Sequence, residues 1–348
     1  MNRKRLLIAI LVFLAVTAAS IGIYVLTPVS LPSGVQDKIT KYTRNKPRAE
    51  LTVVTLTPDS TEVTAYGHDG ERIPVTDRTY EIGGITRAFT GAIAAKAIAE
   101  GRLSPNESCA ELLPLARPAY EPTIFELLTD SAAYSAYAPG IRGSGYTGRN
   151  PYTGIDGNEL IAQMNTFKLS YKPPYLYSCS LFGAAVAGAA VSQAYDVDFY
   201  SILTIFAQEE LGLKHTCVSL DGGPDHAWQW RTNDAYIAAL GLTSTAGDMT
   251  ALARLYLSGE YSPLNDAVKR LLEINADADA GYLTTVRSDG VIWFTGETRH
   301  YAACMMVDRE NEQAVIVLSN YPNDRYGTVN DIAEAVFAET LAAVEAQP

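Results

Sequence analysis

The chain has 348 residues, of which 47% are hydrophobic and 19% are charged, so it can fold around one large core or two ordinary ones. Its 27 Lys and Arg residues and 39 Asp and Glu residues give a formal net charge of -12, which disfavours nucleic acid as a partner. The four histidines and four cysteines lack the close spacing of a zinc site, so the sequence predicts no metal and no cofactor.

The N-terminal segment has the pattern of a membrane anchor. Three basic residues at positions 3–5 precede an uncharged apolar run from Leu6 to Leu26. About 20 apolar residues in a helix match a hydrocarbon core of about 30 Å, and flanking basic residues favour the cytoplasmic side. We therefore predict a single-pass cell-membrane protein with a cytoplasmic tip and anchor over 1–26 and an extracytoplasmic ectodomain. Cleavage as a signal peptide near positions 18–20 is the alternative.

A short linker over 27–35, which contains Pro and Ser, leads to an ectodomain that we assign to residues 36–348. A helix over 36–44 opens it. Alternating β-branched residues over 50–67, with a turn in the middle, then predict a strand hairpin. Without the basic residues of the leader, 24 Lys and Arg face 39 Asp and Glu, a net charge of -15.

Helices are expected in the middle of the chain. An Ala-rich helix begins at Thr86 and ends at Gly101, and residues 110–275 are mostly helical segments joined by loops. The Gly- and Tyr-rich stretch over 134–157 is long for a loop inside a compact domain. It is either a functional lid or a variable surface insertion.

Strand patterns return near the C-terminus, before a closing helix over 330–344. The expected strands lie at 281–288, 291–296, 300–308 and 313–320. Strands at both ends with helices between them predict an α/β (α+β) arrangement. The α/β lobe would be built from about 36–110 and 275–348, and a helical lobe over about 110–275 would be inserted into it.

The ectodomain contains four cysteines in what should be an oxidising compartment. Up to two disulfides are possible, and three pairings stay open. The cysteines are Cys109, Cys179, Cys217 and Cys304.

The segment from Ile82 to Thr90 reads IGGITRAFT and is followed by a helix that ends in EGRLSPNE. It resembles the nucleophile segment of the serine β-lactamase and penicillin-binding-protein superfamily, especially the class C β-lactamase and D-alanyl-D-alanine carboxypeptidase branch. The family pattern is IGSxTKxFT followed by EGxLxLxD. Gly84 therefore occupies the position of the nucleophilic Ser, and Arg87 that of the Lys base.

Five later segments are similar to family motifs that occur in the same order along the chain. FELLTDSAAYS resembles LLTHTSGL, EELGLKHT resembles PLGMxxT, and LGLTSTAGDMTALARLYLSG resembles GGLxSTxDxxxF. YLYSCSLFG resembles YSNxxxxLG, with Tyr177 kept and Cys179 in place of Asn. The strand WFTGETRH resembles the HTG or KTG strand.

In that last strand Phe294 replaces the basic residue, whereas Thr295 and Gly296 are kept. The resemblance covers about residues 36–345. It implies a β-lactamase/transpeptidase-like fold, in which an antiparallel sheet built from both termini is flanked by helices and carries an inserted helical lobe.

The altered positions predict that the family's catalysis is lost. Gly84 has no oxygen to attack a carbonyl, and Arg87 stays protonated and cannot act as a base. Arg87 could attract a ligand carboxylate together with the N–H groups of the helix start, or it could pair with an internal Asp or Glu. The Cys179 and Phe294 replacements would make the pocket more apolar. The pocket candidates are Gly84, Arg87, Tyr177, Thr295, Gly296 and His300.

We therefore expect a degenerate, catalytically inactive member of the superfamily that acts as a binding or interaction module at the cell surface. Its partner would be a peptide, a cell-wall fragment or another protein. One alternative is a serine-hydrolase-like enzyme, such as a β-lactamase, D-Ala-D-Ala carboxypeptidase or esterase, with a non-standard nucleophile. That nucleophile could be Cys179, with His300 or Tyr177 as the base. The other alternative is a structural subunit of a membrane complex.

Overall fold

The computed structural model describes residues 34–345 except 117–120, 142–148, 168–176 and 221–225. Within these described ranges, no helix combines the length and apolar character needed to cross a membrane. The anchor predicted over 6–26 lies outside the described residues, so it stays a prediction.

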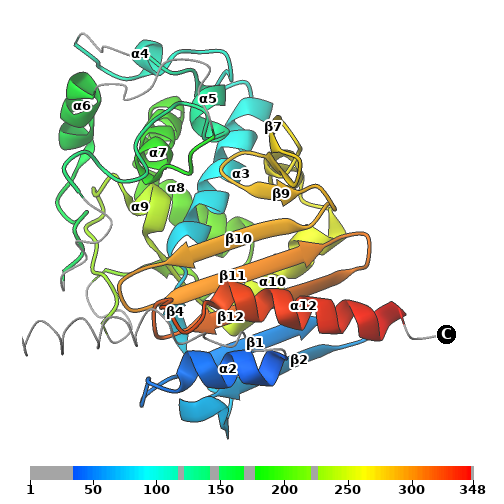
Figure 1. Ribbon diagram of the computed structural model, residues 1–348. Coiled ribbons are helices and arrows are strands. Elements are labelled where there is room, and N and C mark those ends of the chain that lie inside the picture. Colours follow the sequence, from blue (N-terminus) through cyan, green and yellow to red (C-terminus); the bar gives the residue numbers. More distant parts are fainter. Residues whose placement is uncertain (1–33, 117–120, 142–148, 168–176, 221–225, 346–348) are drawn as a thin grey trace, which may run out of the picture.

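A nine-stranded antiparallel sheet forms the centre of the molecule, in the spatial order β3-β2-β1-β12-β11-β10-β9-β8-β7 (Figure 1). Its central strands are β1 (Leu51–Leu56), β12 (Gln313–Ser319), β11 (Ala302–Asp308) and β10 (Ile292–Glu297). Because β1 pairs along its whole length with β12, segments from both ends of the chain lie side by side. This confirms the predicted antiparallel sheet built from both termini.

Apart from β2, which has six residues as β1 does, the remaining strands are short. On the outer sides of the main sheet they are β2 (Thr61–Tyr66), β3 (Arg72–Ile73), β7 (Leu272–Asn275), β8 (Ala278–Ala280) and β9 (Thr285–Arg287). A second, three-stranded sheet in the order β4-β6-β5 consists of β4 (Thr79–Glu81), β6 (Leu242–Thr245) and β5 (Cys217–Val218). Strands of two to four residues are too short for an alternating pattern to reveal, so this small sheet was not expected.

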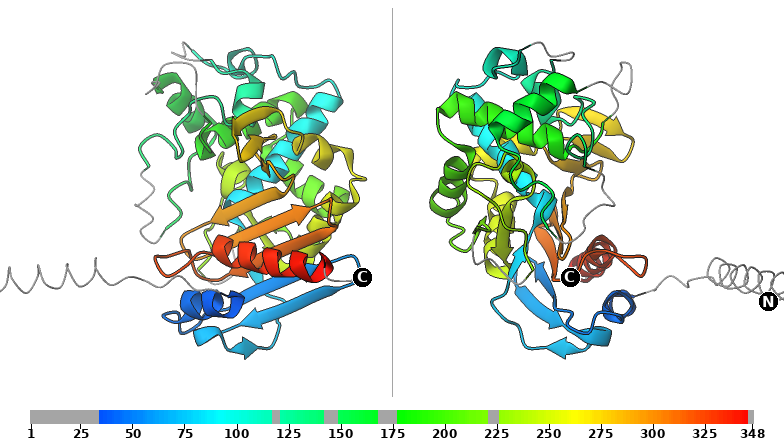
Figure 2. Two further views of the ribbon diagram at one scale, coloured as in Figure 1. Left: turned by 45° about the vertical axis from the view of Figure 1, so that its right-hand side comes forward. Right: turned by 90° about the vertical axis from the view of Figure 1, so that its left-hand side faces the viewer.

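Two helices cover one face of the main sheet. They are α2 (Val35–Thr43) and α12 (Val329–Glu345), and Ile39 and Ile332 are among the residues they bury against it. Figure 2 shows both helices on one side of the sheet and the helical lobe on the other. Because both faces are covered, every residue of β11 and β12 is buried.

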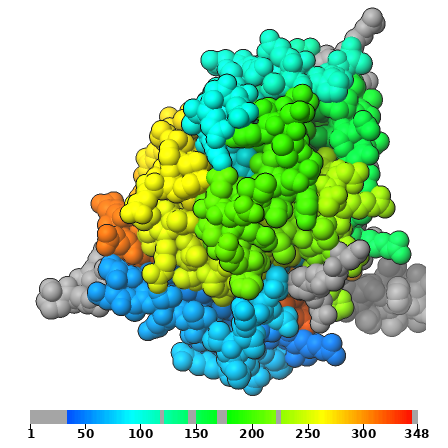
Figure 3. All heavy atoms as spheres, turned by 180° about the vertical axis from the view of Figure 1, so that it is seen from behind, coloured from blue at the N-terminus to red at the C-terminus, as the bar shows by residue number. Residues whose placement is uncertain are grey.

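The other face carries the larger core, into which the Ala-rich helix α3 (Thr86–Ala99) is almost entirely buried. Around it pack α4 (Cys109–Leu112), α5 (Ile124–Leu128), α6 (Gly157–Thr166), α7 (Leu181–Tyr195), α8 (Phe199–Ile205), α9 (Ile237–Leu240), α10 (Ala246–Ser258) and α11 (Ser262–Ala267). Short helical turns are η1 (His68–Gly70), η2 (Gly83–Ile85) and η4 (Phe206–Glu210). Seen from behind, the segments coloured green and yellow form much of the surface on this side (Figure 3).

The helices expected at the start, before residue 101 and at the end of the chain are present as α2, α3 and α12. The strand expected over 281–288 is present only as β9. Leu283 has a φ of 53°, which interrupts an extended strand. The division into lobes near residues 110 and 275 stays a prediction.

The Tyr-rich stretch over 134–157 contributes to the core. The Tyr134 ring packs on Phe182 with centroids 4.6 Å apart, and Tyr152 packs on Tyr236 at 4.8 Å. Both tyrosines are buried in the core. Neither of the two predicted roles, a functional lid or a surface insertion, led us to expect this. Residues 142–148 of this stretch lie outside the described part of the chain.

All four cysteines are free thiols, so none of the disulfides that the sequence allowed is formed in this structure. The residues lie on separate elements. Cys109 belongs to the core that contains α3, whereas Cys304 belongs to the core beneath α2 and α12, on the opposite face of the sheet. Cys217 lies in β5, and Cys179 directly precedes the first turn of α7.

Candidate functional site

The position expected to carry a nucleophile lies in η2, just before α3. Gly83 has a φ of 48°, a left-handed conformation that favours glycine. A Cβ atom on Gly84 would lie 2.9 Å from the carbonyl oxygen of Thr295. A Cβ atom on Gly83 would lie 2.7 Å from the backbone nitrogen of Glu297. Strand β10 therefore approaches this turn so closely that a side chain at position 84 requires a shift of the backbone.

Strand β10 makes the same contact from its own side. A Cβ atom on Gly296 would lie 1.9 Å from the carbonyl oxygen of Ile82. Thr295 is exposed, but the neighbouring Phe294 is only 4% exposed, and its ring centroid lies 5.0 Å from that of Tyr256 on α10. Phe294 thus packs in the core. The expectation that it would make the pocket more apolar is therefore wrong, because its ring does not line an open pocket.

Arg87, on the first turn of α3, forms a buried ion pair with Asp130. The two residues are 7% and 4% exposed. Arg87 also donates from Nη1 to the Cys179 sulfur at 2.6 Å, and Asp130 accepts a hydrogen bond from the Ser180 backbone N–H at 3.1 Å. Of the two uses predicted for Arg87, the described contacts show the pairing with an internal acid.

Charge in this cluster is fixed by burial and by the ion pair. Burial would lower the pKa of Arg87, but the Asp130 carboxylate raises it above its ordinary value, so the guanidinium stays charged. Burial raises the pKa of Tyr177 to about 12, and its hydroxyl lies 3.4 Å from the Thr285 hydroxyl. Burial of the sulfur likewise raises the pKa of Cys179, against the opposing charge of Arg87. Neutral thiol and phenol groups therefore face a neutralised cation, with no base between them.

His300 lies in the turn between β10 and β11, and its ring lies tilted against that of His226 at a centroid distance of 5.4 Å. Burial, Arg299 and His226 lower the pKa of His300, so it is neutral at physiological pH. Among the described residues, no contact joins His300 to Cys179. The structure thus brings Arg87, Tyr177 and Cys179 into one electrostatic cluster and shows His300 in a different contact.

Sequence reasoning missed Asp130, the residue that completes the cluster. A signal was present, because Asp130 stands in LLTDS where the family pattern LLTHTS has His. An acid that replaces a neutral residue in one motif, together with Arg for Lys in another, indicates a new ion pair.

Glu81 was also missed, and it lies directly before the η2 turn. Only 2% of it is exposed. Its carboxylate accepts hydrogen bonds from the Trp228 backbone N–H at 2.7 Å and from the Thr298 hydroxyl at 2.6 Å. Burial raises its pKa to about 7. The carboxyl thus links β4, the β10–β11 turn and the segment before Trp230, and no cation in the described part of the chain pairs with it.

The described residues contain no group of three or more His, Cys, Asp or Glu side chains that could hold a metal ion. Among the described residues, the Arg87 cluster offers hydrogen bonding and charge pairing, and its thiol and phenol have pKa values raised above their ordinary values.

Comparisons with known proteins agree with the fold. The chain is similar to a class C β-lactamase from Rhodobacter sphaeroides, with 17% identity, a TM-score of 0.67, and coverage of 84% of this chain and 95% of that one. It is similar to the octameric penicillin-binding protein homologue from Pyrococcus abyssi, with 20% identity, a TM-score of 0.69, and coverage of 88% and 75%. A β-lactamase/D-alanine carboxypeptidase from Yersinia pestis, complexed with citrate, gives 16% identity, a TM-score of 0.70, and coverage of 89% and 98%.

No curated protein matches the chain significantly. The β-lactamase family model, however, matches residues 39–339, which include the whole main sheet and all the helices that flank it apart from the first residues of α2 and the last of α12. This match spans most of the chain, so the chain belongs to the β-lactamase family of serine-hydrolase-like proteins.

Proposed function

We propose that this protein is a non-catalytic, membrane-anchored member of its family that binds a partner outside the cell. The observation that carries the proposal is the buried Arg87–Asp130 pair, together with a glycine turn in which a side chain at position 84 would require the backbone to shift. The expected nucleophile and the expected base are thus both replaced, by residues that fit their surroundings.

The physical argument concerns what each replacement can do. Without a nucleophile, acceleration can come only from binding and from hydrogen bonds to a developing oxyanion. A guanidinium paired with a carboxylate does not accept a proton at neutral pH. Two separate losses would have to be repaired at once, so a binding role is favoured over residual hydrolysis.

The Arg87–Asp130 pair also limits which ligands the site can bind. Asp130 neutralises Arg87, so a ligand carboxylate near this pair would gain little attraction from the guanidinium. A neutral peptide segment, an uncharged cell-wall fragment or a protein loop fits better. The exposed Thr295 and the half-buried Tyr177 supply hydroxyl groups to such a ligand.

An activity assay tests the proposal directly. The full chain in mild detergent should form no adduct with a fluorescent penicillin, and should hydrolyse neither a chromogenic cephalosporin nor a p-nitrophenyl ester above the buffer rate. An active class C β-lactamase assayed in parallel shows that the reagents work. A stoichiometric mass increase, or saturable turnover, would refute the proposal.

The competing enzyme hypothesis has one specific observation in its favour, the contact between Arg87 and the Cys179 sulfur. The raised pKa of Cys179 argues against it, because the thiolate is the reactive form. A Cys179→Ala variant separates the two hypotheses. If the wild type reacts with a probe and this variant does not, Cys179 is the nucleophile.

Rebuilding the family's residues gives a second test. Gly84→Ser alone should stay inactive, since no base accompanies the hydroxyl. Adding Arg87→Lys should help little while Asp130 keeps the new amine protonated, whereas a further Asp130→Asn change should allow slow acylation by penicillin. Equal acylation in the single and triple variants would show that Arg87 and Asp130 do not control reactivity.

A structural subunit role predicts a different outcome. A stoichiometric protein partner would then stay bound through purification of the native membrane complex in mild detergent. A receptor for a soluble peptide or cell-wall fragment would purify without one.

A further inference from the structure

A small basic cleft lies between α2 and the turn that precedes α12. Its volume is about 180 Å³, and its cationic residues are Lys38 and Lys41 on α2 and Arg325 on the turn. Lys38 and Lys41 are three residues apart, so they lie on one face of the helix. The carboxylates of Asp324 and Asp331 also line the cleft.

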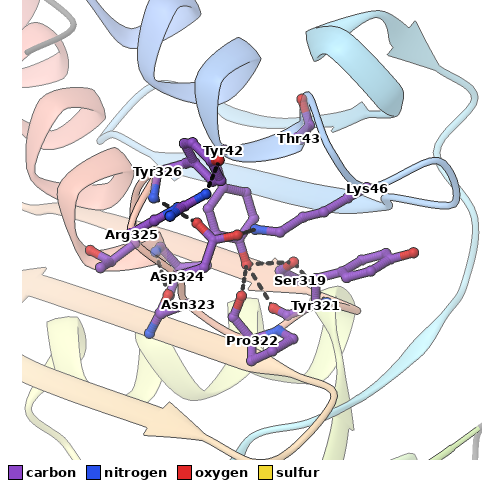
Figure 4. Close-up of polar contacts among 12 residues, drawn as sticks. Tyr42, Thr43, Lys46, Ser319, Tyr321, Pro322, Asn323, Asp324, Arg325 and Tyr326 are labelled. Atoms are coloured by element: carbon purple, nitrogen blue, oxygen red, sulfur yellow. Dashed lines mark hydrogen bonds and ion pairs between the residues drawn. The ribbon is translucent and has the colours of Figure 1, made fainter. Parts of the chain in front are cut away.

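Both of these acids are already engaged within the protein. Asp324 lies 3.3 Å from the Lys46 amine, and Figure 4 shows the two side chains meeting beside the ring of Tyr42. Asp331 accepts hydrogen bonds from the backbone N–H of Thr328 at 3.0 Å and from its hydroxyl at 2.8 Å, as a helix cap does.

The two lysines of the cleft are not balanced in this way. Lys38 and Lys41 are half-buried and form no ion pair with any residue in the described part of the chain. The Arg325 guanidinium donates to the Tyr326 hydroxyl at 2.6 Å and lies over that ring. The cleft therefore presents two lysine charges that the described residues do not pair, although the chain after the leader has a net charge of -15.

The cleft lies close in sequence to the predicted membrane anchor. It borders α2, whose first residue is Val35, nine positions after the end of the apolar run at Leu26. Nine extended residues reach at most roughly 30 Å, so a domain tethered there stays close to the bilayer surface. Two contacts hold α2 firmly, from the Val35 backbone nitrogen to Glu339 at 3.4 Å and from the Tyr42 hydroxyl to Ser319 at 2.9 Å. The lysines therefore have a fixed direction relative to the domain.

We propose that this cleft binds the phosphate groups of anionic phospholipids in the leaflet from which the anchor emerges. The inference rests on the membrane anchoring proposed above and adds a lipid class and a docking face to it. Lysine amines bind phosphate as point charges, and their attraction to an anionic surface decays within about 10 Å at ordinary ionic strength. Because the rest of the ectodomain is acidic and repelled by such a surface, the cleft also orients the domain.

Hydrogen exchange in lipid nanodiscs tests this with the full chain. The wild type is compared in discs of phosphatidylcholine and in discs that also contain phosphatidylglycerol. We expect several-fold slower amide exchange in α2 and in residues 324–332 when phosphatidylglycerol is present, and an effect that fades as salt is raised. The Lys38→Gln/Lys41→Gln variant should lose the difference between the two lipids.

A matched control removes two exposed lysines elsewhere, as Lys214→Gln/Lys269→Gln, and should behave like the wild type. Equal exchange of the wild type in both kinds of disc, or a lipid effect that survives in the Lys38→Gln/Lys41→Gln variant, would overturn the proposal. So would an equal slowing by inorganic phosphate in phosphatidylcholine discs, because the site would then take free phosphate.

A separate experiment tests the membrane-anchor hypothesis by itself. An alkaline wash of native membranes releases a peripheral protein and leaves a spanning one in place. Release would refute the anchor, whereas retention with lipid-independent exchange would refute only the headgroup site.

Discussion

Two buried cations, Arg87 and Lys46, each pair with one aspartate, and the two pairs differ in how exposed that aspartate is. Arg87 and Asp130 are 7% and 4% exposed, so both members of the first pair are inside. Lys46 is 4% exposed, but the side chain of its partner Asp324 is 35% exposed. The Arg87 pair lies at the start of α3, where the sequence resemblance places the family's nucleophile and base, and the Lys46 pair joins the segment after α2 to the turn before α12.

The difference follows from the chemistry of the two cations. A guanidinium cannot lose its proton in the protein, so a buried arginine needs a carboxylate that is fully committed to it. An amine can lose its proton, and burial lowers the pKa of Lys46 although Asp324 opposes this. Lys46 is further stabilised by the Tyr42 ring, whose centroid lies 3.1 Å from its amine. It therefore tolerates a partner that remains partly in water.

The largest effect is expected from Asp130→Asn. Asparagine tolerates the φ of 55° at this position and keeps a hydrogen-bonding side chain, but it leaves Arg87 buried without a counter-charge. Breaking a buried pair in this way costs about 3 to 5 kcal/mol of unfolding free energy. Urea unfolding measures the loss. An additional Arg87→Met change should recover much of it, and a cost below about 1 kcal/mol for the single change would show that the pair is effectively solvated.

Glu81 sharpens the comparison, because it is a buried acid that pairs with no cation among the described residues. Its pKa is about 7 in the folded protein against an ordinary 4.5, so the folded state holds the proton to higher pH than the unfolded chain does. The contribution of protonated Glu81 to the free energy of unfolding is therefore fully present only at acidic pH, below about pH 5. It is lost as the pH rises through 7, and the loss is about 3 kcal/mol in total.

Thermal or urea unfolding between pH 5 and pH 8.5 measures this dependence. Glu81→Gln keeps an acceptor for the Trp228 N–H and has no charge to bury, so its stability should change less over that range. The matched control is Glu62→Gln, at an exposed carboxylate on β2. If the Glu81→Gln and wild-type curves are parallel, Glu81 does not titrate in this range.

The sequence predicted the parts of the fold that depend on long patterns. The alternating strands that became β1, β11 and β12 and the Ala-rich helix α3 extend over enough residues for periodicity to be plain. The strand expected over 281–288 failed at Leu283, because a single positive φ in a non-glycine residue has no sequence signal. The short strands β4 to β6 depend on tertiary pairing rather than on their own residues.

The sequence predicted where the candidate site lies along the chain, but it did not predict which residues contact one another there. Motif order placed Gly84 and Arg87 at the start of one helix, but it could not show that β10 approaches within the reach of a Cβ atom. That distance depends on how the sheet and the helical segments pack. Asp130 lies 43 positions from Arg87 in sequence, so their pairing is a property of the fold.

The smallest effect is expected from Lys46→Met, which replaces the buried amine with an apolar group of similar length. Asp324 can stay solvated when its partner is lost, so the change should cost about 1 kcal/mol or less in urea unfolding at pH 7. Hydrogen exchange in α2 should rise more than exchange in α3, because the Lys46 pair fastens only the first of these helices. A cost as large as that of Asp130→Asn would contradict the comparison. Burial of the cation alone, and not the exposure of its aspartate, would then decide what a pair contributes.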